Sequence, residues 1–152
     1  MPTGGERFCV DTSVAVAALD TGHAEHTTCR KAAQRRRPVL SGHAAFETYS
    51  VLTRLPGRAR VPSAVAWSAI AAAFPERCWL SASQHERLLQ RLASEGIEGG
   101  MVYDALVGEA AREAGLLLLT RDLRALRVYD LLGVRYDVLH SHHWMSGVAA
   151  LP

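Results

Sequence analysis

Residues 7–19 read RFCVDTSVAVAAL, an apolar run that meets a single acid and then resumes. Residues 7–10 suit a short buried strand, whereas the longer run from Thr12 to Leu19 favours a helix. Asp11 lies at the junction, directly after the predicted strand. A buried strand that passes at once into a helix predicts an α/β unit, and the rest of the chain follows the same pattern.

Short apolar runs and longer helical segments alternate along the whole chain. Further strands are predicted at 39–40, 78–80, 116–119 and 135–139, and helices at 23–37, 41–55, 62–74, 83–94 and 101–114. Ser83 and Glu86 have capping-box spacing at the start of one helix, and Gly115 follows the end of another. Short apolar strands separated by helices predict a three-layer α/β fold, in which helices flank a central parallel sheet.

The chain length and composition favour a single globular domain. The 152 residues fit one domain, assigned to 1–140, followed by a tail at 141–152. Hydrophobic residues make up 49% and charged residues 21% of the chain. No segment approaches the ~20 apolar residues of a membrane helix, and the first residues contain no signal-peptide core. We therefore expect a cytoplasmic protein with no membrane association.

Four acids stand where acids are uncommon. Asp11 and Asp122 follow two strongly apolar predicted strands, and ligands of open α/β sheets bind beyond the carboxyl ends of the strands. Glu47 is the sole acid of its predicted helix, and Asp104 is the sole charge in residues 101–107. Because burying a carboxylate on an apolar helix is costly unless it is paired, the four acids are predicted to share one site.

Each acid also has a local interpretation. Asp11 or Asp122 could cap the helix that follows it, and Asp104 could interact favourably with the dipole of its helix. Glu47 could point to solvent. In that case the position of each acid would be explained by its own local structure, and the four acids would not share a site.

Carboxylates that converge repel one another unless a cation neutralises them. A set of oxygen ligands without His or Cys selects Mg²⁺ or Mn²⁺ over zinc. Such ions orient and deprotonate a water molecule and stabilise charge on a phosphate, so the site would suit phosphodiester hydrolysis.

Four segments together carry a resemblance to a known family: VDTS at 10–13, FETYSVLTRL at 46–55, YDALV at 103–107 and LTRD at 119–122. In this order they are similar to the acidic motifs of PIN-domain ribonucleases, and most closely to the toxins of bacterial VapBC toxin–antitoxin pairs. The resemblance runs from about Phe8 to Leu139, and the tail beyond it is longer than the pattern needs.

The resemblance implies a parallel sheet covered on both sides and Mg²⁺- or Mn²⁺-dependent endonucleolytic cleavage of RNA. It also implies inhibition by a cognate VapB-type antitoxin, in a homodimer or a toxin–antitoxin hetero-oligomer. Carried over by position, it identifies the metal-binding acids as Asp11, Glu47, Asp104 and Asp122. Thr120 and Ser13 would assist through hydroxyls that orient a carboxylate or a water molecule.

Other residues are candidates for binding. Arg121, Arg124 and Arg127 are close to Asp122 in the sequence and are expected to contact RNA phosphates. The basic run at 30–37 suits either RNA or a solvated helix end. Trp67 and Trp79 are expected to be core or interface residues. His140, His142 and His143 are expected to lie in a mobile or partner-facing tail.

Two alternative functions remain open at this point. One is a phosphatase-like α/β hydrolase with Asp11 as the nucleophile. That class calls for a second Asp two residues later, where Ser13 stands, and for a lysine near the phosphate, whereas Lys31 is in the basic run. The other is a catalytically silent RNA- or protein-binding module of the same fold.

Overall fold

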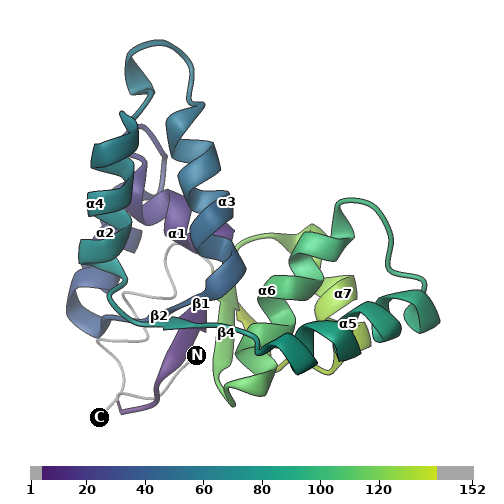
Figure 1. The fold of residues 1–152 in the computed structure, drawn as a ribbon. Coiled ribbons are helices and arrows are strands. Elements are labelled where there is room, and N and C mark those ends of the chain that lie inside the picture. Colours follow the sequence, from purple (N-terminus) through teal and green to yellow (C-terminus); the bar gives the residue numbers. More distant parts are fainter. Residues whose placement is uncertain (1–4, 140–152) are drawn as a thin grey trace.

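The computed structural model of the chain describes residues 5–139 and has a five-stranded parallel sheet at its centre (Figure 1). The strand order is β3-β2-β1-β4-β5. The strands are β1 (Phe8–Val10), β2 (Val39–Ser41), β3 (Arg77–Cys78), β4 (Leu117–Thr120) and β5 (Tyr136–Val138). The α-helices are α1 (Thr12–Leu19), α2 (His26–Arg36), α3 (Gly42–Thr53), α4 (Ser63–Ala73), α5 (Ala82–Glu95), α6 (Met101–Glu113) and α7 (Leu126–Leu132). These helices flank the sheet, which confirms the predicted three-layer α/β fold.

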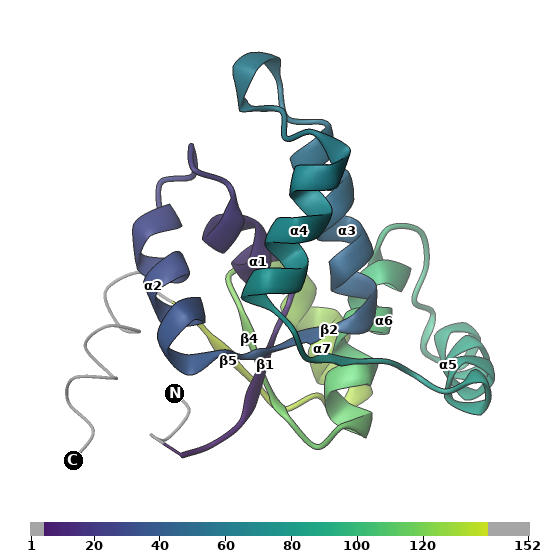
Figure 2. The same ribbon diagram turned by 60° about the vertical axis from the view of Figure 1, so that its left-hand side comes forward.

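The helices form two groups around the sheet. In the first, α1 contacts α2 and α3, and α3 contacts α4, so that α3 and α4 project side by side from the sheet (Figures 1 and 2). In the second, α6 contacts α5 and α7. The two groups meet where α3 contacts α6, and this contact brings together the helices that carry Glu47 and Asp104.

Strands β1 and β4 are completely buried at the centre of the sheet. They pair in parallel, with Cys9 opposite Leu118 and Val10 opposite Leu119. Their nearly uninterrupted apolar sequences follow from this position, because a central parallel strand is covered on both faces. Each large apolar side chain buried here, such as Leu118, contributes about 1.5–3 kcal/mol to folding.

The order of the strands creates a crevice at the carboxyl ends of β1 and β4. From β1 the chain builds outward to β2 and β3, whereas from β4 it builds in the opposite direction to β5. The connections diverge at this point, which is where ligands bind in open α/β sheets. Asp11 follows β1 directly, and its backbone N–H donates to the carbonyl of Leu119 at 3.2 Å. The end of β1 is thus fixed against β4.

Several element boundaries differ from those predicted. The helix predicted at 23–37 begins at His26, because residues 20–25 form turns. The strand predicted at 78–80 is the two-residue β3, Arg77–Cys78. The strand predicted at 116–119 is shifted by one residue, because β4 begins at Leu117 and includes Thr120. Gly115 has φ 69°, in keeping with its predicted place just beyond a helix end.

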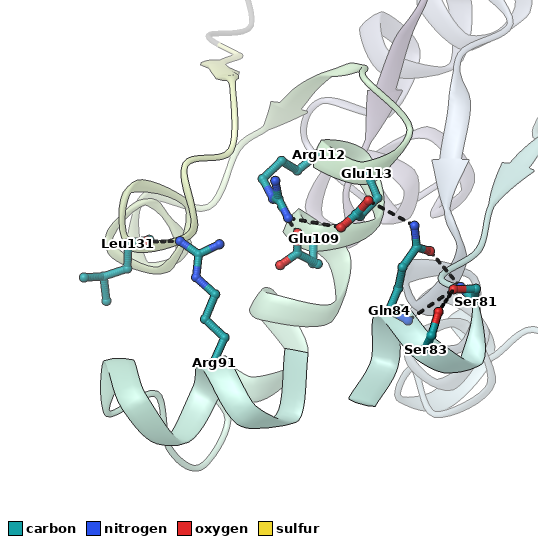
Figure 3. Close-up of polar contacts among 8 residues, drawn as sticks. All are labelled: Ser81, Ser83, Gln84, Arg91, Glu109, Arg112, Glu113 and Leu131. Carbon is teal, nitrogen blue, oxygen red and sulfur yellow. Dashed lines mark hydrogen bonds and ion pairs between the residues drawn. The ribbon is translucent and has the colours of Figure 1, made fainter. Parts of the chain in front are cut away.

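The predicted cap of α5 is wrong by two residues. Ser81, rather than Ser83, is the N-cap: its Oγ accepts from the N–H of Gln84 at 3.1 Å, and Gln84 Oε1 accepts from the N–H of Ser81 at 2.8 Å (Figure 3). The capping-box spacing occurs twice in this segment, at 81–84 and at 83–86, and the structure uses the first.

Polar contacts attach α5 to both α6 and α7 (Figure 3). Gln84 Nε2 donates to Glu113 on α6 at 3.0 Å, and Arg91 donates to the carbonyl of Leu131 on α7 at 3.0 Å. On α6 itself, Arg112 pairs with Glu113 and with the buried Glu109. Helix α5 therefore bridges the two helices that carry Asp104 and Tyr129.

Within residues 5–139, no helix is both long enough and apolar enough to cross a membrane. The predicted tail at 141–152 lies outside the described residues, as do the three histidines expected to face a partner.

The corrected cap gives a stability prediction. Ser81→Ala should lower the free energy of unfolding by about 1 kcal/mol, because the N–H of Gln84 loses its acceptor. Ser83→Ala is the matched control and should change it by less than about 0.5 kcal/mol. Urea denaturation of both variants measures the difference, and equal losses would show that Ser81 is not the effective cap.

Candidate functional site

The crevice at the ends of β1 and β4 is a cleft of about 450 Å³. The structure brings the four predicted acids to its walls from four separate parts of the chain. They are Asp11 after β1, Glu47 on α3, Asp104 on α6 and Asp122 after β4, and Ser13 lies among them. Residues more than 100 positions apart in the sequence therefore face one cavity.

Asp11 is the most buried of these acids, with 4% of its surface exposed. Its Oδ1 accepts from the Ser13 hydroxyl at 2.5 Å and from the N–H of Val14 at 3.3 Å, and its Oδ2 accepts from the Tyr129 hydroxyl at 3.1 Å. Burial raises the pKa of Asp11, and these hydrogen bonds oppose the rise. Asp11 also caps α1 through Val14, so the local interpretation is correct and compatible with a place in the site.

Glu47 faces the cleft from α3. It is half-buried, and its Oε1 accepts from the Thr12 hydroxyl at 3.0 Å. Thr12 is the first residue of α1 and follows Asp11 directly. Asp11 therefore contributes one carboxylate to the cleft, and the neighbouring Thr12 orients the carboxylate of Glu47.

Asp104 shows the electrostatic consequence of this arrangement. Its pKa is raised from 3.8 to about 6, first by burial and then by the negative charges of Asp122, Glu47 and Asp11. The ionised carboxylate is therefore less favourable in the cleft than in water. A cation bound in the cleft would remove this penalty.

Two hydroxyls connect the ends of β1 and β4. Ser13 accepts from the N–H of Arg121 at 2.8 Å while it donates to Asp11. Thr120 accepts from the N–H of Asp122 at 3.0 Å and is also hydrogen-bonded to Asp11. Ser13 and Thr120 thus occupy the orienting positions expected of them.

The predicted RNA-binding arginines separate into two groups. Arg121 and Arg124 line the cleft. Arg121 lies 3.3 Å from the His23 ring, and the exposed Arg124 lies 3.7 Å from Asp122. Arg127 is exposed but is absent from the cleft wall, so nearness to Asp122 in the sequence did not place it at the site.

Within residues 5–139, no three His, Cys, Asp or Glu side chains already form a metal-binding group. The acids line the cleft without closing on one point. Their oxygens, with the neighbouring hydroxyls, are nevertheless the donors that Mg²⁺ and Mn²⁺ prefer, and their mutual repulsion at Asp104 calls for a positive charge. The donor chemistry of these residues therefore fits such an ion.

Three polar residues of the cleft are not predicted from the sequence: Thr12, His23 and Tyr129. Thr12 adjoins Asp11, and this adjacency was the available signal. His23 lies in the turn before α2. Tyr129 lies on the buried side of α7 with Val128 and Leu132, and its position in the sequence is therefore typical of a core residue. Burial and the nearby carboxylates raise the pKa of Tyr129, so its hydroxyl acts as a donor.

Exposed aromatic side chains gather beside the site in a pocket of about 350 Å³. This aromatic pocket is lined by Ala45, Phe46, Tyr49, Trp67, Ile70, Arg77 and Trp79. Trp67 and Trp79 are 55% and 56% exposed, so they are not core residues and only the interface alternative remains. The Arg77 guanidinium lies over the Trp67 ring at 5.5 Å, and Phe46 meets Trp79 edge-on at 5.9 Å.

Comparison with known proteins gives consistent matches. The sequence model of the PIN domain matches residues 8–131. Ribonuclease VapC40 of Mycobacterium tuberculosis is 43% identical over 131 residues, which cover 85% of this chain and 96% of that protein. Ribonuclease VapC27 of the same species is also 43% identical over 131 residues, covering 86% and 96%.

A solved structure shares the fold. The crystal structure of VapBC2 from Rickettsia felis, bound to a DNA fragment from their promoter, matches with a TM-score of 0.61 and 14% identity. The match covers 88% of this chain and 98% of that chain. At this identity the likeness concerns the fold.

The raised pKa of Asp104 predicts a pH-dependent loss of stability in metal-free protein. The loss should be absent below the usual pKa of 3.8, grow as pH rises, and be complete above about 6. Asp104→Asn should therefore raise the free energy of unfolding by about 1–2 kcal/mol at pH 8, allowing for solvent screening of this half-buried group, and by much less near pH 4.

Glu98→Gln is the control for this experiment, because it removes one negative charge from an exposed position outside the cleft. Urea denaturation in the presence of a chelator, at both pH values, measures the effect. A gain for Asp104→Asn that did not depend on pH would contradict the electrostatic explanation.

Proposed function

The chain belongs to the PIN domain family, and we propose that it is a divalent-metal-dependent endoribonuclease that acts as the toxin of a bacterial type II toxin–antitoxin pair. One observation carries the proposal: four carboxylates from separate elements share a cleft at the carboxyl ends of the central strands. The names of the relatives, Ribonuclease VapC40 and Ribonuclease VapC27, support RNA as the substrate.

The proposed roles follow from the positions in the cleft. The residues that would hold Mg²⁺ or Mn²⁺ are Asp11, Glu47, Asp104 and Asp122. When bound, the ion supplies an activated water molecule and positive charge for the phosphodiester group. Ser13 and Thr120 orient Asp11 through their hydroxyls, while Arg121 and Arg124 bind RNA phosphates at the rim.

The two alternative functions fit the site less well. The phosphatase class calls for a second Asp where Ser13 stands and for a lysine near the phosphate, whereas Lys31 lies on α2 and does not line the cleft. A silent binding module would have no use for a cleft in which carboxylates raise the pKa of Asp104.

The partner we propose is a small antitoxin that acts on the toxin in the cytoplasm, where RNA is present. A basic side chain of the antitoxin would enter the acidic cleft and form charge-assisted hydrogen bonds with the carboxylates. Its apolar side chains would pack in the aromatic pocket, since exposed Trp and Tyr residues in a concave surface are typical of binding hot spots. Assembly with a second toxin chain is compatible with this arrangement.

Removal of single carboxylates tests the enzymatic proposal. Asp11→Asn and Glu47→Gln should each reduce Mn²⁺-dependent cleavage of RNA by more than about 100-fold, because each removes a charge from the metal-binding set. Glu98→Gln, outside the cleft, should cleave at the rate of the unchanged protein. A chelator should stop cleavage in every case.

Folding of each variant is checked by circular dichroism, so that lost activity cannot be assigned to unfolding. Near-normal cleavage by folded Asp11→Asn would remove this residue from the proposed site.

The partner is tested by co-expression with the neighbouring reading frame. The antitoxin should co-purify with the 152-residue chain and inhibit it. Trp79→Ala should weaken the complex by about 30-fold or more, as expected for a hot-spot residue. Leu89→Ala is the control, because Leu89 is an equally exposed apolar residue on α5 and does not line the aromatic pocket. Recovery of free, active toxin from the co-expression would contradict the toxin–antitoxin assignment.

A further inference from the structure

Tyr129 is a fully buried residue of α7, and within residues 5–139 its side chain makes one hydrogen bond, which is to the site. Its side chain is 1% exposed, and its hydroxyl donates to Asp11 Oδ2 at 3.1 Å. It also forms part of the cleft wall. Tyr129 and Asp11 are 118 positions apart in the sequence, so their contact depends on the tertiary fold.

The ring of Tyr129 occupies a space that α6 leaves open at Gly108. A Cβ atom at Gly108 would lie 2.8 Å from Cδ1 of Tyr129 and 3.0 Å from its Cε1, which is closer than such atoms approach. Glycine inside a helix costs about 1 kcal/mol relative to alanine. The helix accepts this cost at the one position where the ring of Tyr129 lies against it.

A second aromatic ring packs against Tyr129. The centroid of Tyr136, on β5, lies 5.9 Å from that of Tyr129, and the Tyr136 hydroxyl donates to Asp130 at 2.8 Å, away from the cleft. With α6 and Tyr136 both against it, the Tyr129 ring has little freedom to turn. The direction of its hydroxyl is therefore set by the packing of α6, α7 and β5.

The contact adds a long-range donor to those around Asp11, which include the hydroxyls of Ser13 and Thr120. Ser13 and Val14 donate to Oδ1, whereas Tyr129 donates to Oδ2, so the plane of the carboxylate is held from both sides. The first two donors follow Asp11 in the sequence and would be present in any helix that begins this way. The Tyr129 donor comes from α7, 118 positions further along the chain.

We propose that Tyr129 is a positioning residue for the divalent-metal site: its hydroxyl fixes the Asp11 carboxylate in the orientation that receives the ion. The inference rests on the proposed function, because it assigns the role of Asp11 as a metal ligand. In this role Tyr129 acts through Asp11.

Calorimetric titration of the full chain with Mn²⁺ alone, without RNA, tests the inference. Tyr129→Phe keeps the ring and removes the hydroxyl, and its Mn²⁺ affinity should fall by about 10-fold or more, as for other groups that orient metal ligands. Tyr136→Phe is the matched control: it makes the same chemical change on the neighbouring ring, and its affinity should stay within about two-fold of the unchanged protein. Gly108→Ala crowds both the Tyr129 ring and Val134 while the Tyr129 hydroxyl stays intact, and it should also weaken Mn²⁺ binding.

Cleavage kinetics separate positioning from a general loss of structure. With Tyr129→Phe, the Mn²⁺ concentration for half-maximal activity should rise about 10-fold, while KM for RNA stays unchanged and saturating Mn²⁺ restores most of kcat. A defect that saturating Mn²⁺ does not correct would identify a structural role and overturn the inference.

Two results distinguish this inference from the proposed function. If the unchanged protein binds Mn²⁺ and folded Tyr129→Phe binds it equally well, the inference alone is wrong. If the unchanged protein binds no Mn²⁺, the metal-dependent function is wrong and the inference falls with it. An equal loss in Tyr129→Phe and Tyr136→Phe would also overturn the inference, since it would reflect aromatic packing.

Discussion

The burial of Asp11 at the end of β1 is the constraint on which the site depends. A carboxylate that is 4% exposed loses most of its hydration, and the loss must be offset by hydrogen bonds or by a cation. Ser13, Val14, Thr120 and Tyr129 supply the hydrogen bonds. Thr120 belongs to β4, and the other three lie on the helices α1 and α7 that follow the two central strands. The central strands therefore stabilise the fold and also place a charged group where water is scarce.

The other three carboxylates make the electrostatic cost larger. Burial raises the pKa of Asp104, the negative charges of Asp122, Glu47 and Asp11 add to the rise, and the pKa reaches about 6. The contact between α3 and α6 keeps Glu47 and Asp104 on facing walls of the cleft, and α5 holds α6 against α7 from the outside. Much of the structure thus maintains an arrangement that is unfavourable without a bound cation, as expected of a functional site rather than of a stabilising one.

The sequence predicted the fold and the convergence of the acids from two simple rules. Apolar runs without alternation indicate parallel strands covered on both faces, and ligands bind beyond the carboxyl ends of such strands. These rules identify Asp11 and Asp122 with no knowledge of strand order. The cap of α5 was misplaced because Ser81 and Ser83 each have an acceptable partner three residues later, and local sequence does not choose between them.

Long-range contacts explain what sequence reasoning missed. An aromatic residue at helical spacing is usually part of the core, and Tyr129 is indeed buried; only its hydroxyl distinguishes it. Gly108 could have been noticed as a glycine inside a helix, but its ring partner is 21 positions away. Arg127 was assigned from proximity in sequence, which does not specify the direction of a side chain.

Neighbouring residues on α3 connect the acidic cleft to the aromatic pocket. Glu47 faces the cleft, whereas Phe46 lines the pocket, and a third hollow of about 430 Å³ is lined by both of them. His43 and Tyr103 border this hollow with their rings stacked at 5.4 Å. A chain segment whose apolar side chain fills the aromatic pocket can therefore present a basic side chain to the carboxylates within a few residues. The same geometry would allow a basic side chain of the proposed antitoxin to occupy the proposed metal site, because a side chain can supply the positive charge as an ion would.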